Sequence, residues 1–380
     1  MIVARFLDWV VTAPAERRAE AVGLLARAWL YSDLSVDEAE AAEAALTAML
    51  DDPSARVRRS LAEALGRDPK SPSHIILSLA YDHVEIAEIV LRASPVLLDE
   101  DLIDIAAAAS SRIQVAIASR AWVSVPVSAA IAEVGSLAAC ISLCNNYGAE
   151  MTASNLRRIA DRHGGDPILR QLIFNRHDCP VGVRQVLVSK IGEALGNLTL
   201  VKATIDDDRL STIMREACDK ATVALSANIP DEDVAGLVEH LCTSGQMTPS
   251  LLLRALCTGH LRLFEQAVSR LSCLPMKRVK QVLSNGRTRP IFALFERAGL
   301  PRSTWQVFST GFEIIVELDH QGQSGDIYAF SRLLLQRVQD LGVQSPDRDV
   351  QRLLALLRRF AAESARDAAR RNPHLARLAA

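Results

Sequence analysis

The chain has 380 residues, of which 49% are apolar and only 4% are aromatic, and its formal net charge is −2. A length of this order fits two or three domains or one long repeat array. The near-neutral charge excludes a global field that would draw the whole chain onto nucleic acid or membrane. The charge is uneven, however. Residues 1–130 hold 12 basic against 19 acidic residues, and residues 331–380 hold 10 basic against 5 acidic ones.

The first residues and the cysteines indicate a cytoplasmic location. Residues 1–11 are apolar but include Arg5 and Asp8, and no small-residue cleavage site follows them, so we expect no signal peptide. No stretch approaches the ~20 apolar residues that span a bilayer. An odd number of cysteines within apolar helical patterns is typical of reduced core thiols in a cytosolic protein. The seven are Cys140, Cys144, Cys179, Cys218, Cys242, Cys257 and Cys273.

Residues 1–50 predict an N-terminal helical capping region. Ser35-Val-Asp-Glu38 is a capping-box sequence, in which a serine and a glutamate three residues later satisfy the first N–H groups of a helix. It precedes a predicted helix at 39–50. A second predicted helix at 16–30 completes the region.

Residues 51–200 predict an array of short helix pairs. Five segments share a turn followed by a short apolar helix, and their anchor residues are 24 to 30 residues apart. A second short helix fits between successive anchors, at 72–81, 100–109, 126–134 and 152–162, and a helix at 183–195 ends the array. Because a pair of such helices cannot bury its own apolar face, the pairs must stack. The anchors are Val57, Ile86, Val115, Ala139 and Leu169.

The spacing of the predicted helices changes near residue 200, and longer helices are predicted after it. We assign 201–322 to a helical domain and 323–380 to C-terminal helices with a basic amphipathic tail. The glycine-containing segment 321–325 and the segment 344–346 are the expected links. No convincing strand pattern occurs. The predicted fold is therefore all-α, a HEAT-like α-solenoid of short helix pairs followed by a C-terminal helical domain. Its further predicted helices are 208–227, 231–243, 249–257, 261–271, 277–283, 290–298, 303–318, 326–341 and 347–371.

Three motifs carry a family resemblance: Ile75-Ile-Leu-Ser-Leu-Ala80-Tyr-Asp-His, Gln114-Val-Ala-Ile-Ala-Ser-Arg120, and Leu251-Leu-Leu-Arg254-Ala-Leu-Cys-Thr-Gly259. With their surroundings, over roughly residues 45–320, they resemble an uncharacterised alphaproteobacterial domain-of-unknown-function family with HEAT-like repeats. The resemblance implies an α-helical repeat fold and no established activity, so it supplies no catalytic residue. Single repeats also resemble the short HEAT-like repeats of phycobilin lyases, a likeness that informs shape rather than function.

No complete catalytic or metal-binding pattern is present in the sequence. Cys140 and Cys144 share a helix face, but no second pair of ligands accompanies them or the His/Cys neighbours near 178 and 241, so core thiols are favoured over zinc. His177-Asp-Cys179-Pro180 holds a nucleophile beside a base, but the proline indicates a turn. Glycine turns occur without the preceding strand that a phosphate loop needs. We therefore expect no enzyme activity, no metal and no cofactor.

A nucleic-acid-binding HEAT-like protein, such as one that repairs DNA, is the alternative function. Two sets of basic residues support this alternative. However, the array as a whole is not basic, whereas proteins that bind duplex DNA or RNA usually present a basic surface to it. The first set is Arg56, Arg58, Arg59, Arg112, Arg120, Arg157, Arg158 and Arg162, and the second is Lys277, Arg278, Lys280, Arg287 and Arg289.

The leading hypothesis is a non-catalytic, regulatory scaffold or adaptor that binds protein partners of unknown identity. Polar residues on the repeat helices or at their ends form the candidate interaction surface, although the same residues could instead cap or bridge repeats. They are Arg58, Glu85, Arg120, Asn145, Asn146 and Arg176.

The basic tail leaves several alternatives open. It could dock on the preceding helices, bind a partner, lie on an anionic membrane surface or fold back on the acidic N-terminal third. Its candidate residues are Arg352, Arg358, Arg359, Arg366 and Arg370.

Overall fold

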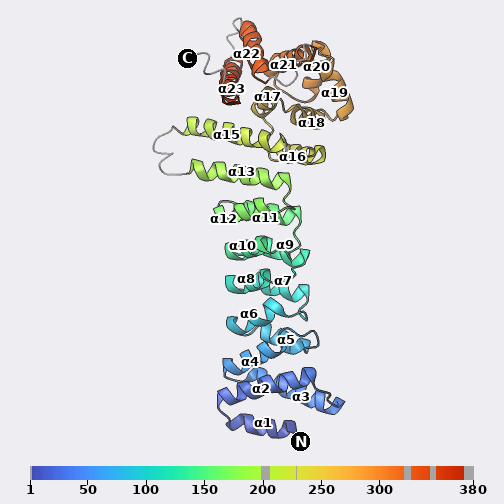
Figure 1. Ribbon diagram of the computed structural model, residues 1–380, viewed down its shortest axis with the longest axis vertical. Helices are drawn as coiled ribbons and strands as arrows, with labels where there is room; N and C mark the ends of the chain where they lie inside the picture. Colours follow the sequence, from blue (N-terminus) through green and yellow to red (C-terminus); the bar gives the residue numbers. More distant parts are fainter. Residues whose placement is uncertain (1, 198–205, 228, 321–326, 343–347, 372–380) are drawn as a thin grey trace. The chain divides into compact units, whose positions relative to one another are not determined.

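The computed structural model describes residues 2–197, 206–227, 229–320, 327–342 and 348–371 (Figure 1). In these residues every regular element is an α-helix except the short 3-10 helix η1 (Met49–Asp51), and one isolated parallel bridge joins Val123 and Ala149. The all-α, repeat-like prediction is confirmed. The chain forms two compact units, unit 1 (1–179) and unit 2 (180–380), each described below by itself.

Unit 1 is a stack of short helices in two layers. Each even-numbered helix from α2 to α10 packs on the next even-numbered helix, and α7 packs on α9 and α9 on α11. Figure 1 shows the resulting helix pairs one above another. The helices are α1 (Ile2–Thr12), α2 (Ala15–Tyr31), α3 (Val36–Ala48), α4 (Ala55–Leu65), α5 (Ser73–Ala80), α6 (Val84–Ala93), α7 (Asp99–Ala108), α8 (Ser111–Ala118), α9 (Val125–Val134), α10 (Leu137–Asn145), α11 (Ala153–His163) and α12 (Pro167–Asn175).

Local sequence signals explain where these helices begin. The predicted capping box is present, since the Ser35 hydroxyl accepts from the Glu38 N–H and the Glu38 carboxylate accepts from the Ser35 N–H. Side chains at Ser136, Thr152 and Asp166 likewise accept the N–H three residues on. These caps fix the start of each helix and therefore the register of its apolar face.

Arginine side chains, and the side chain of Asn146, donate hydrogen bonds to carbonyl groups at the ends of several helices. The last carbonyls of an α-helix lack partners within the helix and carry its negative dipole end. Arg120, which follows α8, donates to the carbonyls of Leu91 and Ser94 at the end of α6, at 2.6 and 2.7 Å. We call such contacts carbonyl clamps. They recur from Asn146 to Ala118 and Arg120, from Arg162 to Ala132 and Gly135, from Arg176 to Cys144, Asn146 and Ala149, from Arg262 to Ser226 and Ile229, and from Arg297 to Ser272.

Unit 2 is helical and has a core centred on aromatic rings. Phe264 makes edge-to-face contacts with Phe295, Phe308 and Phe312 at centroid distances of 5.2 to 6.3 Å. Leucines and valines from the surrounding helices complete this core. The helices are α13 (Val181–Gly196), α15 (Asp207–Ala227), α16 (Asp231–Thr243), α17 (Pro249–Cys257), α18 (Leu261–Ser272), α19 (Met276–Ser284), α20 (Thr288–Arg297), α21 (Arg302–His320), α22 (Ile327–Gly342) and α23 (Arg348–Arg371).

The structure divides the chain into two units, with a boundary between Cys179 and Pro180. Helix α13, which the sequence suggested as the last helix of the array, makes its contacts in unit 2. The predicted links at 321–325 and 344–346 lie outside the described residues, and the four-part division stays a prediction. In the part of the chain that the structure describes, no helix is both long enough and apolar enough to cross a membrane.

Candidate interaction surface

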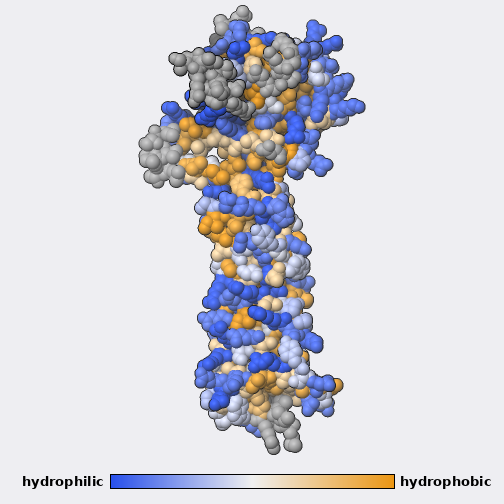
Figure 2. Space-filling view, in the orientation of Figure 1, coloured by the Kyte–Doolittle hydropathy of each residue, from blue (hydrophilic) through white to orange (hydrophobic). Residues whose placement is uncertain are grey.

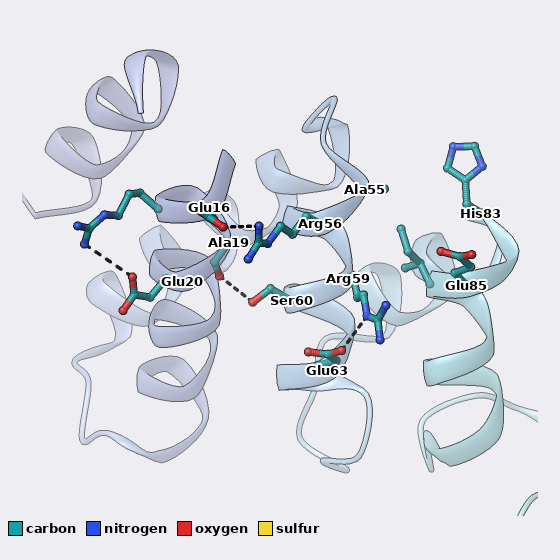
Figure 3. Close-up of a pocket in the computed structure, with 12 residues that line it drawn as sticks. Glu16, Ala19, Glu20, Ala55, Arg56, Arg59, Ser60, Glu63, His83 and Glu85 are labelled. Carbon is teal, nitrogen blue, oxygen red and sulfur yellow. Dashed lines mark hydrogen bonds and ion pairs between the residues drawn. The ribbon is translucent and has the colours of Figure 1, made fainter. Parts of the chain in front are cut away.

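A charged groove crosses α2, α4, α6 and α8 of unit 1, and Figure 3 shows the part of its lining over α2, α4 and α6. A cleft of about 970 Å³ lies over α2, α4 and α6, and a second cleft of about 540 Å³ lies over α4, α6 and α8. Arg59, Glu63 and Glu85 line both clefts, so the two form one groove. Its charged residues are Glu16, Arg17, Glu20, Arg56, Arg59, Glu63, Arg67, Glu85, Glu88, Arg92 and Arg112.

Helical periodicity places these charges on one face. In α4 the residues Val57, Leu61 and Leu65 are fully buried, at intervals of four, while Arg59 and Glu63 project from the opposite face. Ser60 donates to the carbonyl of Ala19 at 2.7 Å and thereby ties α4 to α2. In Figure 2 hydrophilic side chains predominate over α4, α6 and α8, whereas apolar ones gather around α12.

The net charge of the groove is close to zero, but its lining is rich in charged side chains, with six arginines and five glutamates. Arg56 pairs with Glu16 at 2.6 Å, and Arg112 pairs with Glu88 at 2.8 Å. Exposed ion pairs of this kind contribute little to stability, because water competes for both charges. The same charges can therefore re-pair with charges on a bound partner at small cost.

The predicted surface residues separate into two groups. Glu85 lines the groove and Asn145 is exposed at the end of α10. Arg120, Asn146 and Arg176 are carbonyl clamps.

Arg58 also makes contacts within the chain. It donates to both carboxylate oxygens of Asp82, at 2.6 and 2.9 Å, and to the carbonyl of Asp52. Burial would raise the pKa of Asp82, but the hydrogen bonds from Arg58 and from the His83 N–H lower it below its usual value. Four of the six predicted residues thus cap or bridge repeats, which is the alternative that the sequence left open.

Sequence reasoning missed most of the groove. Glu16, Glu20, Glu63, Glu88 and Arg92 were not singled out, and Arg56, Arg59 and Arg112 were considered only for nucleic acid. The available signal was a set of charges at intervals of three and four opposite the apolar face of each short helix, as at Glu85, Glu88 and Arg92 of α6. Only stacking brings these faces together.

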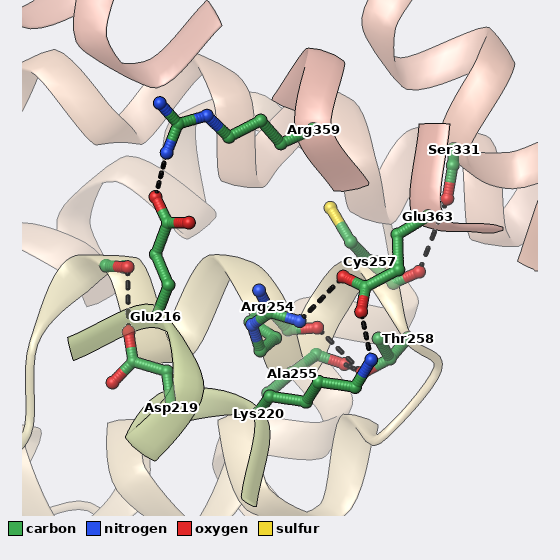
Figure 4. A network of polar contacts seen from close by, with 11 residues as sticks. Glu216, Asp219, Lys220, Arg254, Ala255, Cys257, Thr258, Ser331, Arg359 and Glu363 are labelled. Carbon is green, nitrogen blue, oxygen red and sulfur yellow. Dashed lines mark hydrogen bonds and ion pairs between the residues drawn. The ribbon is translucent and has the colours of Figure 1, made fainter. Parts of the chain in front are cut away.

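The basic tail packs within unit 2 (Figure 4). Leu354, Leu357 and Phe360 of α23 are buried in its core. Arg254 of α17 lies 4.3 Å from the ring centre of Phe360 and donates to Glu363 at 3.0 Å, and Lys220 of α15 donates to the same carboxylate.

Four of the five predicted tail arginines are described, and they lie on the exposed side of this helix. Arg359 pairs with Glu216 of α15. Arg358, Arg366 and Arg370 are exposed. The side chain of Arg352 lies outside the described residues. The apolar face of α23 is thus occupied by contacts inside unit 2, as expected of a docked terminal helix.

Cys140, Cys144 and Cys179, considered for metal, are buried thiols, whereas Cys242 is half-buried. Burial raises the pKa of Cys140 to about 11 and that of Cys144 to about 12. Because the thiolate is the form that binds metal and attacks substrates, these thiols are poorly suited to either task. Across the described ranges, no group of three or more His, Cys, Asp or Glu residues is placed to hold a metal ion.

Comparison with known proteins gives one family. A family model described as an uncharacterised protein conserved in bacteria (DUF2336) matches residues 86–346, which begin in α6 and include the α6–α8 end of the groove. No curated protein matches the chain, and no solved structure matches it.

Proposed function

Since the chain belongs to the DUF2336 family of bacterial proteins, we propose that it is a non-catalytic interaction scaffold that binds a protein partner in the charged groove. A regulatory role in the cytoplasm is part of this proposal. The stacked helix pairs of unit 1 support its assignment as a HEAT-like array, because such stacks present long surfaces to partners.

The groove is the observation that carries the proposal. It runs over four successive even-numbered helices, and the carbonyl clamps of Arg120 and Asn146 hold the ends of two of them, α6 and α8. Its lining mixes arginines with glutamates, so a partner segment with both signs of charge is the best match. Glu85, which lines both clefts, is the natural probe of occupancy.

Photo-crosslinking from the groove tests the proposal. A photoreactive amino acid replaces Glu85 in the full chain, and the same replacement at Glu232, an exposed residue of α16, is the control. We expect one protein to be captured repeatedly from position 85 and not from position 232. Capture should fall at least tenfold in Arg59→Glu/Arg92→Glu and persist in Arg302→Glu, whose side chain is 83% exposed and outside the groove. Equal capture from positions 85 and 232 would remove the groove as the binding surface.

A gel shift with duplex DNA at low salt separates this proposal from the nucleic-acid alternative. Several of the basic residues considered for DNA serve the fold itself, since Arg58 pairs with a carboxylate and Arg120 and Arg162 are carbonyl clamps. We therefore expect no shift. A salt-dependent shift that Arg59→Glu/Arg92→Glu abolishes would favour nucleic acid over a protein partner.

A further inference from the structure

Unit 2 contains a pocket between α13 and α15 that the proposed scaffold role does not use. Its volume is about 600 Å³, and residues of the turn after α16 and of the first turn of α17 complete its lining. Pockets for small molecules in proteins commonly have volumes of about 300–1,000 Å³. We call it the α13–α15 pocket.

Small residues on α13 leave this space open. Ser189, Gly192 and Gly196 lie at intervals of three and four, so they share the face of α13 that lines the pocket. A Cβ atom at Gly192 would lie 2.9 Å from the Cys218 sulfur, so a larger residue there would have to displace the Cys218 thiol. A Cβ atom at Gly196 would lie 3.7 Å from Met214, which is ordinary contact.

Part of the lining is apolar. Leu210 and Met214, one helical turn apart on α15, line the pocket together with Leu241 and Leu251. Leu241 and Leu251 also belong to the buried core of unit 2, so they are fixed by packing on their other sides. This part of the pocket suits a hydrocarbon or aromatic body.

A preorganised row of polar groups forms another part. The Thr222 hydroxyl donates to the side-chain amide oxygen of Gln185 at 2.9 Å, the Gln185 side chain donates to that of Gln246 at 3.3 Å, and Gln246 donates to the Ser189 hydroxyl at 3.2 Å. Gln185 and Thr222 are each only 2% exposed. These hydrogen bonds fix the amide orientations before any ligand arrives.

Asp219 is a buried carboxylate in the lining of the pocket. It is 7% exposed, and the Ser250 hydroxyl donates to one of its carboxylate oxygens at 2.8 Å (Figure 4). Burial raises the pKa of Asp219, although the hydrogen bond from Ser250 and the charges of Arg254 and Arg215 oppose the rise. A cationic partner would relieve this penalty on the charged form.

The charges of the lining favour a cation. Among the described residues of its lining, the carboxylates are Glu193, Asp207 and Asp219, and the basic side chain is Arg215. We propose that the α13–α15 pocket binds a small molecule with an apolar body and a protonated amine, and that the amine pairs with Asp219. The site is in unit 2 and the groove is in unit 1, so either assignment can fail without the other.

Calorimetric titration of the full chain tests the assignment with three probes of similar shape. We expect 2-phenylethylamine to bind, 2-phenylethanol to bind less tightly, and 3-phenylpropanoate to bind least. Asp219→Asn should weaken the amine about tenfold, the usual effect of losing a charged hydrogen-bond partner, and should leave the alcohol nearly unchanged. The amide introduced by Asp219→Asn keeps an oxygen that can accept from Ser250, so the local fold should survive, as far-ultraviolet circular dichroism can verify.

Two matched variants complete the test. Asp233→Asn alters an exposed carboxylate on α16 outside the pocket and should leave all affinities unchanged. Gly196→Leu should fill the pocket and weaken all probes, whereas Gly236→Leu, at a position with open space around it, should not. Equal binding of amine and carboxylate, unchanged amine binding in Asp219→Asn, or no binding of any probe at millimolar concentration would overturn the proposal.

Discussion

Replacing Arg120 with methionine removes one carbonyl clamp while keeping most of the side-chain volume. Each hydrogen bond from a charged donor contributes about 1.5–3 kcal/mol, so two such bonds set an upper bound of about 3–6 kcal/mol. Burial lowers the pKa of Arg120, because desolvation disfavours its charge, and that penalty disappears with the guanidinium. Water can reach part of the vacated site, although Ser94 is fully buried. We therefore expect a loss of about 2–4 kcal/mol in the free energy of unfolding.

The assay is urea unfolding followed by tryptophan fluorescence in a Trp305→Phe background. The remaining tryptophans, Trp9, Trp29 and Trp122, all lie in unit 1, so the signal reports that unit alone. Arg112→Met is the matched control. Arg112 is on helix α8, which Arg120 follows, but its side chain is 58% exposed and its ion pair with Glu88 should contribute below about 1 kcal/mol.

The comparison between the two variants decides the matter. If Arg112→Met destabilised unit 1 as much as Arg120→Met, neither burial nor carbonyl capping would explain which arginines stabilise the stack. If Arg120→Met changed the free energy of unfolding by less than about 0.5 kcal/mol, the clamps would orient the helices without stabilising the fold.

Three further predictions concern charge and burial. Asp82→Asn should lower the urea midpoint of unit 1 at neutral pH. The difference from wild type should shrink below about pH 4. A carboxyl group whose pKa is lowered in the folded state stabilises the fold at pH values above its pKa in the unfolded chain, and this stabilisation is lost as the pH falls and the group protonates. Among the thiols, exposed Cys273 should react first with a thiol reagent at pH 8. Cys257, whose pKa burial raises to about 12, should react only on unfolding. Glu363→Ala should leave the buried Arg254 without its carboxylate and expose α23 to limited proteolysis.

Each of these has a clear contrary outcome. A pH-independent difference for Asp82→Asn would remove its ion pair as the cause. Rapid labelling that survives Cys273→Ser would show that another thiol is accessible. For the tail, Glu317→Ala is the control, because Glu317 and Arg337 form a largely exposed ion pair. Equal proteolysis of the Glu317→Ala and Glu363→Ala proteins would argue against a specific role for Glu363.

Helix positions were predictable because their signals are local. The predicted helices 72–81, 100–109 and 126–134 correspond to α5, α7 and α9 within two residues at each end. Prolines, capping side chains and the apolar period all lie within a few residues of the feature they specify. The same locality explains the capping box at Ser35 and Glu38.

The contacts between repeats were not predictable in the same way. Arg120 and Arg176 stand at helix ends, where an arginine in sequence suggests exposure, yet their acceptors are carbonyls of an earlier helix pair. The groove and the α13–α15 pocket depend on which helix faces meet after stacking. Taken one helix at a time, the charged residues and glycines that line them do not differ from other charged residues and glycines on helix surfaces.

The clamps also bear on how such a chain can change its length. Within unit 1 the donor and its acceptors are 26 to 32 residues apart, close to the spacing of one helix pair. A tandem duplication of one pair would add one donor and one set of acceptor carbonyls, and a deletion would remove one of each. Arrays of this kind can therefore gain or lose whole helix pairs over evolutionary time without leaving a guanidinium group that lacks its carbonyl acceptors.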